Sequence, residues 1–257
     1  MSPLLAVHLS DGILSPAWLV SGFAIMGISL WWGLRNLREE EIPLVGILTV
    51  AFFVATLIHV PAPVGTTHML LNGLVGILLG PRAAVAIPLG LLLQSTLLGH
   101  GGLTVLGVNT AIMLLPALLV APLFAKCKRS ERFAHARFRW MMSFGLGMLG
   151  VLGTAVLFFV TLALGSVEDV KILAWVAFVL HLPILVLEGL LTASAVTFLY
   201  RVKPAMLGII PHKGTPPVTA PPIGQALLLQ RPTLSPNPPA QCVPDGPIAT
   251  PAPDHLA

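Results

Sequence analysis

Seven apolar stretches, separated by charged or turn-forming residues, constrain this chain more than any other feature. They cover 16–34, 42–60, 69–80, 83–98, 103–124, 141–165 and 172–200. Several of them can cross about 30 Å of hydrocarbon at about 1.5 Å per helical residue. Only 9% of the residues are charged, against about 25% in a soluble domain. The sequence therefore predicts an integral membrane protein and excludes an ordinary cytosolic enzyme, a disordered chain and a DNA-binding domain.

The third and fourth stretches are short, and Gly80, Pro81 and Arg82 separate them. We interpret them as two short helices rather than one interrupted helix, which gives an all-α membrane bundle of about seven transmembrane helices. With seven crossings, the basic residues outside the tail, Lys171 excepted, fall on one side, and the positive-inside rule makes that side cytoplasmic. We therefore expect a multi-pass protein of the plasma membrane, with its N-terminus outside and its C-terminus in the cytoplasm. The basic residues on the cytoplasmic side are Arg35, Arg38, Arg82, Lys126, Lys128, Arg129, Arg132, Arg137, Arg139, Arg201 and Lys203.

Composition divides the chain into three parts. An outer N-terminal segment, 1–15, precedes the bundle, 16–203, and a tail, 204–257, holds fourteen of the 24 prolines. A segment so rich in proline cannot form helices or bury a core, so we expect a disordered cytoplasmic tail. The net charge of +4 is a small excess, which membrane topology explains better than nucleic-acid binding. Cys127 and Cys242 form no plausible disulfide framework.

Three glycines within the sixth stretch, Gly145, Gly147 and Gly150, form a literal G-x-G-x-x-G. A dinucleotide site needs a strand before this motif and a helix after it, whereas these glycines lie within an apolar run. We interpret them as positions of close helix packing, as with Gly76 and Gly80. The sequence contains no Walker A, H-E-x-x-H or G-x-S-x-G motif, so it indicates neither an ATPase nor a familiar hydrolase.

Histidines are the most informative polar residues. His8 lies in the outer N-terminal segment and His68 ends an outer loop, 61–68, while His59 and His100 are expected near the same face. Neutral imidazole is the commonest protein ligand for first-row metals, and polar groups buried in a membrane are costly unless they are used. Each histidine alone is better explained by a hydrogen bond to a loop carbonyl. The small turn residues around His8 and His68 shift the interpretation toward a metal site.

A few further polar side chains interrupt the apolar stretches. Glu188, the only carboxylate in an expected membrane helix, is either functional or locks the bundle through a hydrogen bond to a loop or helix end. Gln94 and Asn109 either line the same outer cavity or pair helices, and His181 is expected within the last helix. The candidates for side chains around the two histidines are Asp11, Thr66, Gln94, His100, Asn109 and Glu188.

Four segments of the chain together resemble a known family, the cobalt and nickel uptake proteins of the CbiM/NikM type. The opening VHLSDGILSP resembles the family's M-H-x-x-D-G opening. The resemblance continues, in order and spacing, through PVGTTHMLLNGLVGILLGP, LLLQSTLLGHGGLTVLGVNT and HLPILVLEGLLTASAVTFLYRV, and covers about residues 7–205. It implies a substrate-capture subunit of an energy-coupling-factor transporter, with Co²⁺ or Ni²⁺ as cargo, no resident cofactor and no enzymatic reaction in this chain. The implied partners are a transmembrane coupling subunit, cytoplasmic ATPase subunits and, as a further candidate, a small accessory membrane subunit.

The resemblance also implies the metal ligands. In the family, the N-terminal amine, the amide and imidazole of a second-position histidine, and a loop histidine hold the metal; His8 and His68 match the two histidines. Four such nitrogens form a square-planar field that suits Ni(II), and Co(II) accepts it with less preference. These residues do not choose between the two ions.

The sequence departs from the family pattern at its start, because its histidine is residue 8 instead of residue 2. We therefore expect translation to begin at Val7, read from a GUG codon as methionine, which would place a free amine next to His8. Intact mass of the active protein checks this expectation. If residues 1–6 are retained, His8 and His68 need other ligands, such as Asp11 or water.

Two other classes of function compete with metal capture. A stand-alone secondary metal transporter would carry the ion without ATP, which transport by this chain alone in proteoliposomes would reveal. An intramembrane metalloenzyme would need several histidines and carboxylates at one depth, and the expected helices contain a single acid, Glu188. The sequence favours capture, with the outer loop 61–68 as the gate.

Overall fold

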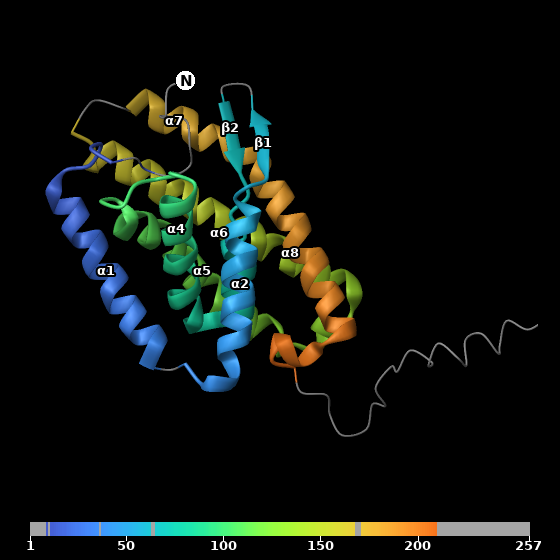
Figure 1. Ribbon diagram of the computed structural model, residues 1–257. Coiled ribbons are helices and arrows are strands. Elements are labelled where there is room, and N and C mark those ends of the chain that lie inside the picture. Colours follow the sequence, from blue (N-terminus) through green and yellow to red (C-terminus); the bar gives the residue numbers. More distant parts are fainter. Residues whose placement is uncertain (1–8, 10, 36, 63–64, 168–170, 210–257) are drawn as a thin grey trace, which may run out of the picture. The chain divides into compact units, whose positions relative to one another are not determined.

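The computed structural model describes residues 9, 11–35, 37–62, 65–167 and 171–209, and every structural statement below concerns this part of the chain. Its helices are α1 (Pro16–Arg35), α2 (Ile42–Ala55), α3 (Asn72–Leu79), α4 (Ala83–Leu97), α5 (Leu106–Cys127), α6 (Ala136–Gly165), α7 (Lys171–Leu180) and α8 (Leu182–Val202). Short 3-10 turns lie at Glu39–Glu41, Gly80–Arg82, Glu131–Ala134 and Pro204–Leu207. The strands β1 (His59–Ala62) and β2 (Gly65–His68) form an antiparallel hairpin (Figure 1).

Apolar helices make up nearly all of the described chain, which confirms the prediction of a helical membrane bundle. Five stretches are long and apolar enough to cross a membrane: Pro16–Arg35, Asn72–Leu97, Leu106–Cys127, Ala136–Gly165 and Ala174–Val202. Large apolar side chains also cover the outward faces; Val20, Ile28 and Trp31 on α1 are 60–70% exposed. Such surfaces are stable against lipid and unstable in water.

The stretch Asn72–Leu97 contains two helices that run in opposite directions. On α3, Asn72 donates to the carbonyl of Met113, and Gly76 approaches the backbone of Ala117, so α3 runs parallel to α5. On α4, the turn at Arg82 pairs with the start of α2, and Gly90 packs on Phe52, so α4 runs parallel to α2. The chain therefore reverses at Gly80–Arg82, as the sequence predicts.

Seven helices of the described chain thus run between two ends of the bundle. α1, α3, α5 and α8 run in one direction, and α2, α4 and α6 run in the other (Figure 1). The N-terminal end carries Leu9, residues 11–15, the hairpin, the loop 98–105 and α7. The C-terminal end carries the four 3-10 turns, which follow α1, α3, α5 and α8. Which end faces the cytoplasm stays a prediction from the positive-inside rule.

Three element boundaries differ from the prediction. α2 ends at Ala55 because the chain then enters the hairpin, so the predicted helix 42–60 and loop 61–68 were both wrong in part. The last predicted helix breaks at His181 into α7 and α8; Pro183, next to the break, lacks an N–H for a continuous ladder. α6 begins at Ala136, and Arg139, expected in a loop, is buried in it and donates to the carbonyl of Phe133.

Close packing explains some of the glycines that we singled out. Gly147 lies against α8, with a Cβ built at this position only 2.9 Å from the carbonyl oxygen of Glu188, and Gly150 lies against α3. Gly145 faces open space, so the packing prediction was wrong there. It was also wrong for Gly80, which has φ +55° and forms the turn between α3 and α4 instead.

The start of the predicted tail is folded. Residues 204–207 form a 3-10 turn, and Leu207 is buried against α5 and α6 residues. Lys128 donates to the carbonyl of Leu207 at 2.7 Å, which attaches this turn to the end of α5. The rest of the tail, from residue 210, lies outside the described residues.

Candidate metal site

The N-terminal segment is built into the bundle at Leu9. The side chain of Asn109, on α5, accepts a hydrogen bond from the Leu9 N–H at 3.1 Å and donates one to the Leu9 carbonyl at 3.2 Å. A carboxamide can do both because it carries a donor and an acceptor. Both residues are buried, Leu9 at 1% exposure and Asn109 at 4%. Asn109 therefore fixes the backbone directly after His8.

Further contacts hold the same segment downstream. Asp11 accepts hydrogen bonds from the N–H of Thr104, at 3.0 Å, and from its hydroxyl group. Asp11 also sits so close to Gly102 that a Cβ there would collide with its carboxylate. Ser15 then donates to the carbonyl of Gly165 at the end of α6, at 2.9 Å. The segment is thus attached to α5, to the loop 98–105 and to α6.

His68 ends β2 and enters the bundle from the hairpin. It lies opposite His59 in the register of the two strands, and its side chain is 5% exposed. Its Nδ1 lies 3.1 Å from the carbonyl oxygen of Met69. A carbonyl only accepts, so Nδ1 carries the proton and Nε2 keeps its lone pair in the neutral ring. A histidine that binds a metal is commonly oriented in this way, by a carbonyl on its other nitrogen.

Glu188 holds the turn that follows His68. Its Oε1 accepts hydrogen bonds from the backbone N–H groups of Leu70, at 2.5 Å, and Leu71, at 2.8 Å. Leu71 has φ +48°, the one non-glycine residue of the described chain in the left-handed region. Successive N–H groups around such a residue form a concave site for an anion. Of the two interpretations of Glu188, the hydrogen bond to a helix end is the one that these contacts match.

Asn72, which the sequence analysis missed, docks the same segment on α5. Its Nδ2 donates to the carbonyl of Met113 at 3.2 Å and to the hydroxyl of Thr154 at 2.7 Å. It is 0% exposed at the start of α3. A single asparagine within an apolar stretch was the available signal. Met113 lies four residues after Asn109 on α5, so the segments that follow His8 and His68 both dock on one turn of that helix.

Gln94 adds a buried carboxamide at the same end. It is 1% exposed near the end of α4, and neither its oxygen nor its nitrogen has a hydrogen-bond partner among the described residues. Its backbone carbonyl accepts from the N–H of His100, in the half-buried loop after α4. Thr66 lies in β2 opposite Pro61, and its side chain is not described.

The structure buries four of the residues expected around the site. His68, Gln94, Asn109 and Glu188 are all at least 95% buried at or near the N-terminal end. Val7 and His8 lie outside the described residues. Within the described ranges, no group of three or more His, Cys, Asp or Glu side chains could hold a metal ion, so His68 is the one expected histidine ligand whose surroundings are known.

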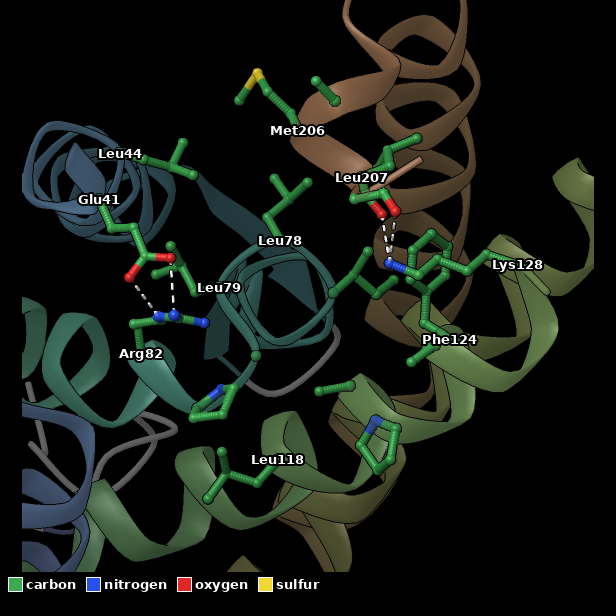
Figure 2. A pocket seen from close by; sticks show the side chains of 18 of the residues that line it. Glu41, Leu44, Leu78, Leu79, Arg82, Leu118, Phe124, Lys128, Met206 and Leu207 are labelled. Atoms are coloured by element: carbon green, nitrogen blue, oxygen red, sulfur yellow. Dashed lines mark hydrogen bonds and ion pairs between the residues drawn. The ribbon is translucent and has the colours of Figure 1, made fainter. Parts of the chain in front are cut away.

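A cavity at the C-terminal end has the wrong chemistry for a transition metal. It measures about 650 Å³, and none of its described lining residues is a histidine or cysteine. Figure 2 shows the ion pair of Glu41 and Arg82 on one side of the cavity and Lys128 on the other side. In this pair, the Arg82 Nη2 lies 2.7 Å from the Glu41 carboxylate. Burial lowers the pKa of the Lys128 ammonium group. This cavity is separate from the residues around His68.

Residues 8–206 match the family described as the CbiM cobalt uptake substrate-specific transmembrane region. The chain belongs to this family. It is 34% identical over 203 residues to a Haemophilus influenzae protein named for metal transport, across 78% of this chain and 97% of that protein. It is also 36% identical over 122 residues to the fused nickel transport protein NikMN of Rhodobacter capsulatus, across 45% of this chain and 35% of that protein.

A solved structure supports the fold. The crystal structure of a truncated transition metal transporter superposes with a TM-score of 0.56 at 22% identity, over 75% of this chain and 96% of that one. With the CbiM match and the apolar helices, the chain is a multi-pass membrane protein of a cobalt and nickel transport family.

Proposed function

We propose that this chain is the metal-capturing membrane subunit of an energy-coupling-factor transporter that imports Co²⁺ or Ni²⁺. One observation carries the proposal. The segment after His8 binds α5 at Asn109, and the segment after His68 binds it at Met113. Four helical residues rise about 6 Å, so both histidine-bearing segments reach one small region at the N-terminal end.

The proposed ligands are nitrogens. His68 contributes Nε2, and His8 contributes its imidazole and backbone amide, with the amine of Val7 completing four nitrogens if the chain begins there. The Nδ1 contact of His68 with the Met69 carbonyl leaves its Nε2 in the form that binds metals. A set of nitrogen ligands suits late first-row ions, in contrast to the oxygen ligands that Mg²⁺ and Ca²⁺ prefer.

Import also requires that the site loses affinity when it opens inward, since equal affinity in both states would move no ion. The hairpin His59–His68 is the proposed gate, because His68 ends its second strand. Energy would come from cytoplasmic ATPase subunits through a transmembrane coupling subunit. A shift of the hairpin would move His68 away from the N-terminal segment, and the Glu188 contacts with the next turn would resist that shift until the partners supply energy.

Calorimetry on the full chain in detergent tests this function. We expect tight binding of Co²⁺ or Ni²⁺ and at least a hundredfold loss in His68→Ala, which should still fold and melt cooperatively. His135→Ala is the matched control, because His135 is exposed beside α6 at the other end of the bundle. Unchanged affinity in His68→Ala would remove this residue from the site, and no binding by the unaltered chain would refute the function.

Reconstitution separates capture from autonomous transport. We expect the chain alone in proteoliposomes to bind the ion without moving it across the membrane. Uptake of radioactive Ni²⁺ driven by an ion gradient, with no ATP and no partner, would replace the proposal by a stand-alone secondary transporter.

A further inference from the structure

The cavity at the C-terminal end plays no part in the proposed function. It measures about 650 Å³, which falls within the range of about 300–1,000 Å³ for small-molecule sites. Its walls come from the end of α1, the start of α2, the end of α3 with the turn after it, the end of α5 and the turn after α8. Because these segments meet without filling the space between them, the cavity has room for a ligand.

The charged residues that line this cavity carry more positive than negative charge. They are Arg38, Arg82 and Lys128, against the single carboxylate of Glu41. Glu41 accepts hydrogen bonds from both guanidinium groups, at 3.0 Å from Arg38 and at 2.8 Å from Arg82. The neighbouring acids, 39–40, are exposed and lie outside the lining. The walls therefore favour an anionic ligand.

Lys128 faces this cavity from the side opposite Glu41 and Arg82 (Figure 2). Its Nζ donates to the carbonyl oxygens of Leu207, at 2.7 Å, and Gly208, at 3.4 Å. These carbonyls do not neutralise the ammonium charge, and no carboxylate of the described residues forms an ion pair with it. An ammonium group has three donors. A phosphate oxygen beside Nζ would accept the third hydrogen bond and supply the missing negative charge.

The rest of the lining is largely apolar and includes Leu44 and Leu78. A free inorganic anion gains nothing from such side chains, whereas the glycerol and acyl part of a lipid is stabilised by them. Beyond Leu44, the residues Ile47, Val50 and Val54 continue along one side of α2 and are 47–66% exposed. This stripe offers acyl chains an apolar surface that begins at the cavity wall.

The cavity also lies at the membrane depth of lipid headgroups. The membrane-spanning stretches Pro16–Arg35 and Leu106–Cys127 end beside it, and Trp32, which is 41% exposed, lines it. Tryptophan is enriched where membrane helices meet the headgroups. The positive-inside rule predicts that this end is cytoplasmic, where the leaflet is rich in anionic lipids and basic pockets between helices bind their headgroups.

We propose that this cavity binds the headgroup of an anionic phospholipid, with its phosphate at Lys128 and its acyl chains along the apolar stripe of α2. The site does not depend on metal capture. It would connect α2, α5 and the turn after α8 through one lipid molecule.

Native mass spectrometry of the full chain, released from detergent, tests the lipid selectivity. We expect one phosphatidylglycerol to be retained per chain, at least tenfold more tightly than phosphatidylcholine with the same acyl chains. Equal retention of the two lipids would overturn the proposal. Displacement of phosphatidylglycerol by inorganic phosphate would assign the cavity to a free anion instead. Retention of neither lipid would leave an acidic segment of a partner protein as the occupant and would also overturn the proposal.

The variant Lys128→Gln tests the position of the site, and Lys126→Gln is its matched control. Lys126 carries the same charge near the same helix end, but it is exposed and lies outside the lining. We expect at least tenfold weaker binding of phosphatidylglycerol in Lys128→Gln and unchanged binding in Lys126→Gln and Lys128→Arg. Equal weakening in both glutamine variants would refute a specific site. If Lys128→Gln fails to fold, Lys128→Arg and the lipid selectivity of the unaltered chain still decide the proposal.

Discussion

Replacement of Asn109 by leucine tests whether the docked N-terminal segment holds the metal. Leucine has the same number of side-chain heavy atoms and the same branching as asparagine but makes no hydrogen bonds. Asn109→Leu would leave the buried N–H and carbonyl of Leu9 without partners, since both now bind the Asn109 side chain. At about 1–3 kcal/mol for each unpaired group, the docked segment loses about 2–6 kcal/mol.

That loss should appear mainly in metal binding. Residues 11–15 remain attached through Asp11 and Ser15, so the variant should fold while the segment around Leu9 detaches. Metal binding then has to supply the free energy that docks the segment on α5. The lower limit of that docking loss, about 2 kcal/mol, corresponds to about 30-fold weaker metal binding. Calorimetric titration with Ni²⁺ and Co²⁺, together with a thermal melt of the same sample, measures both effects.

Thr49→Val is the matched control. The Thr49 hydroxyl is buried on α2 and donates to the Val45 carbonyl at 2.8 Å, remote from the N-terminal segment. Its loss should lower stability by about 1 kcal/mol and leave metal affinity unchanged. If Asn109→Leu bound both ions as tightly as the unaltered chain, the N-terminal segment would contribute no ligand, and the reasoning from docking to metal capture would fail.

Three further predictions concern stability. Glu188→Ala leaves the buried N–H of Leu70 and the part-buried N–H of Leu71 unpaired and should cost at least about 1–3 kcal/mol, whereas Glu188→Gln keeps an acceptor and should cost less, as denaturation in detergent would measure. Glu41→Gln should lower stability by about 1 kcal/mol at neutral pH. Hydrogen bonds from Arg38 lower the Glu41 pKa. The stabilising effect of the carboxylate should therefore be lost as the pH falls through that lowered pKa. Gly76→Val should lower the melting temperature, because its side chain meets the backbone of Ala117.

Much of the fold follows from the sequence because a bilayer imposes simple lengths. The apolar runs predict the membrane helices. The turn residues Gly80 and Pro81 predict the reversal between α3 and α4, whereas hydropathy alone treats 72–97 as one apolar stretch. The hairpin was missed because the apolar residues of β1 extend the hydropathy of α2, and pairing between His59 and His68 depends on tertiary context rather than on local composition.

The site was less predictable because its contacts join distant residues. The sequence singled out Glu188 and Asn109 as polar residues in apolar surroundings, but their partners lie about a hundred residues away. No local pattern tells which backbone group such a side chain binds. Asn72 was missed for a related reason. The sequence places it inside an apolar stretch, and only the structure shows that the hairpin precedes it and that α3 begins there.

Two buried polar side chains at the N-terminal end, Asn109 and Glu188, share one task, which explains why an aliphatic bundle retains them. Asn109 binds the backbone of Leu9, and Glu188 binds the backbone of Leu70 and Leu71. Non-helical backbone within a membrane must find hydrogen-bond partners in the protein, and these are the non-helical segments that His8 and His68 adjoin. A bundle that only packed helices would need neither segment nor its partners. The proposed metal capture needs both, because it brings ligands from separate parts of the chain to one ion.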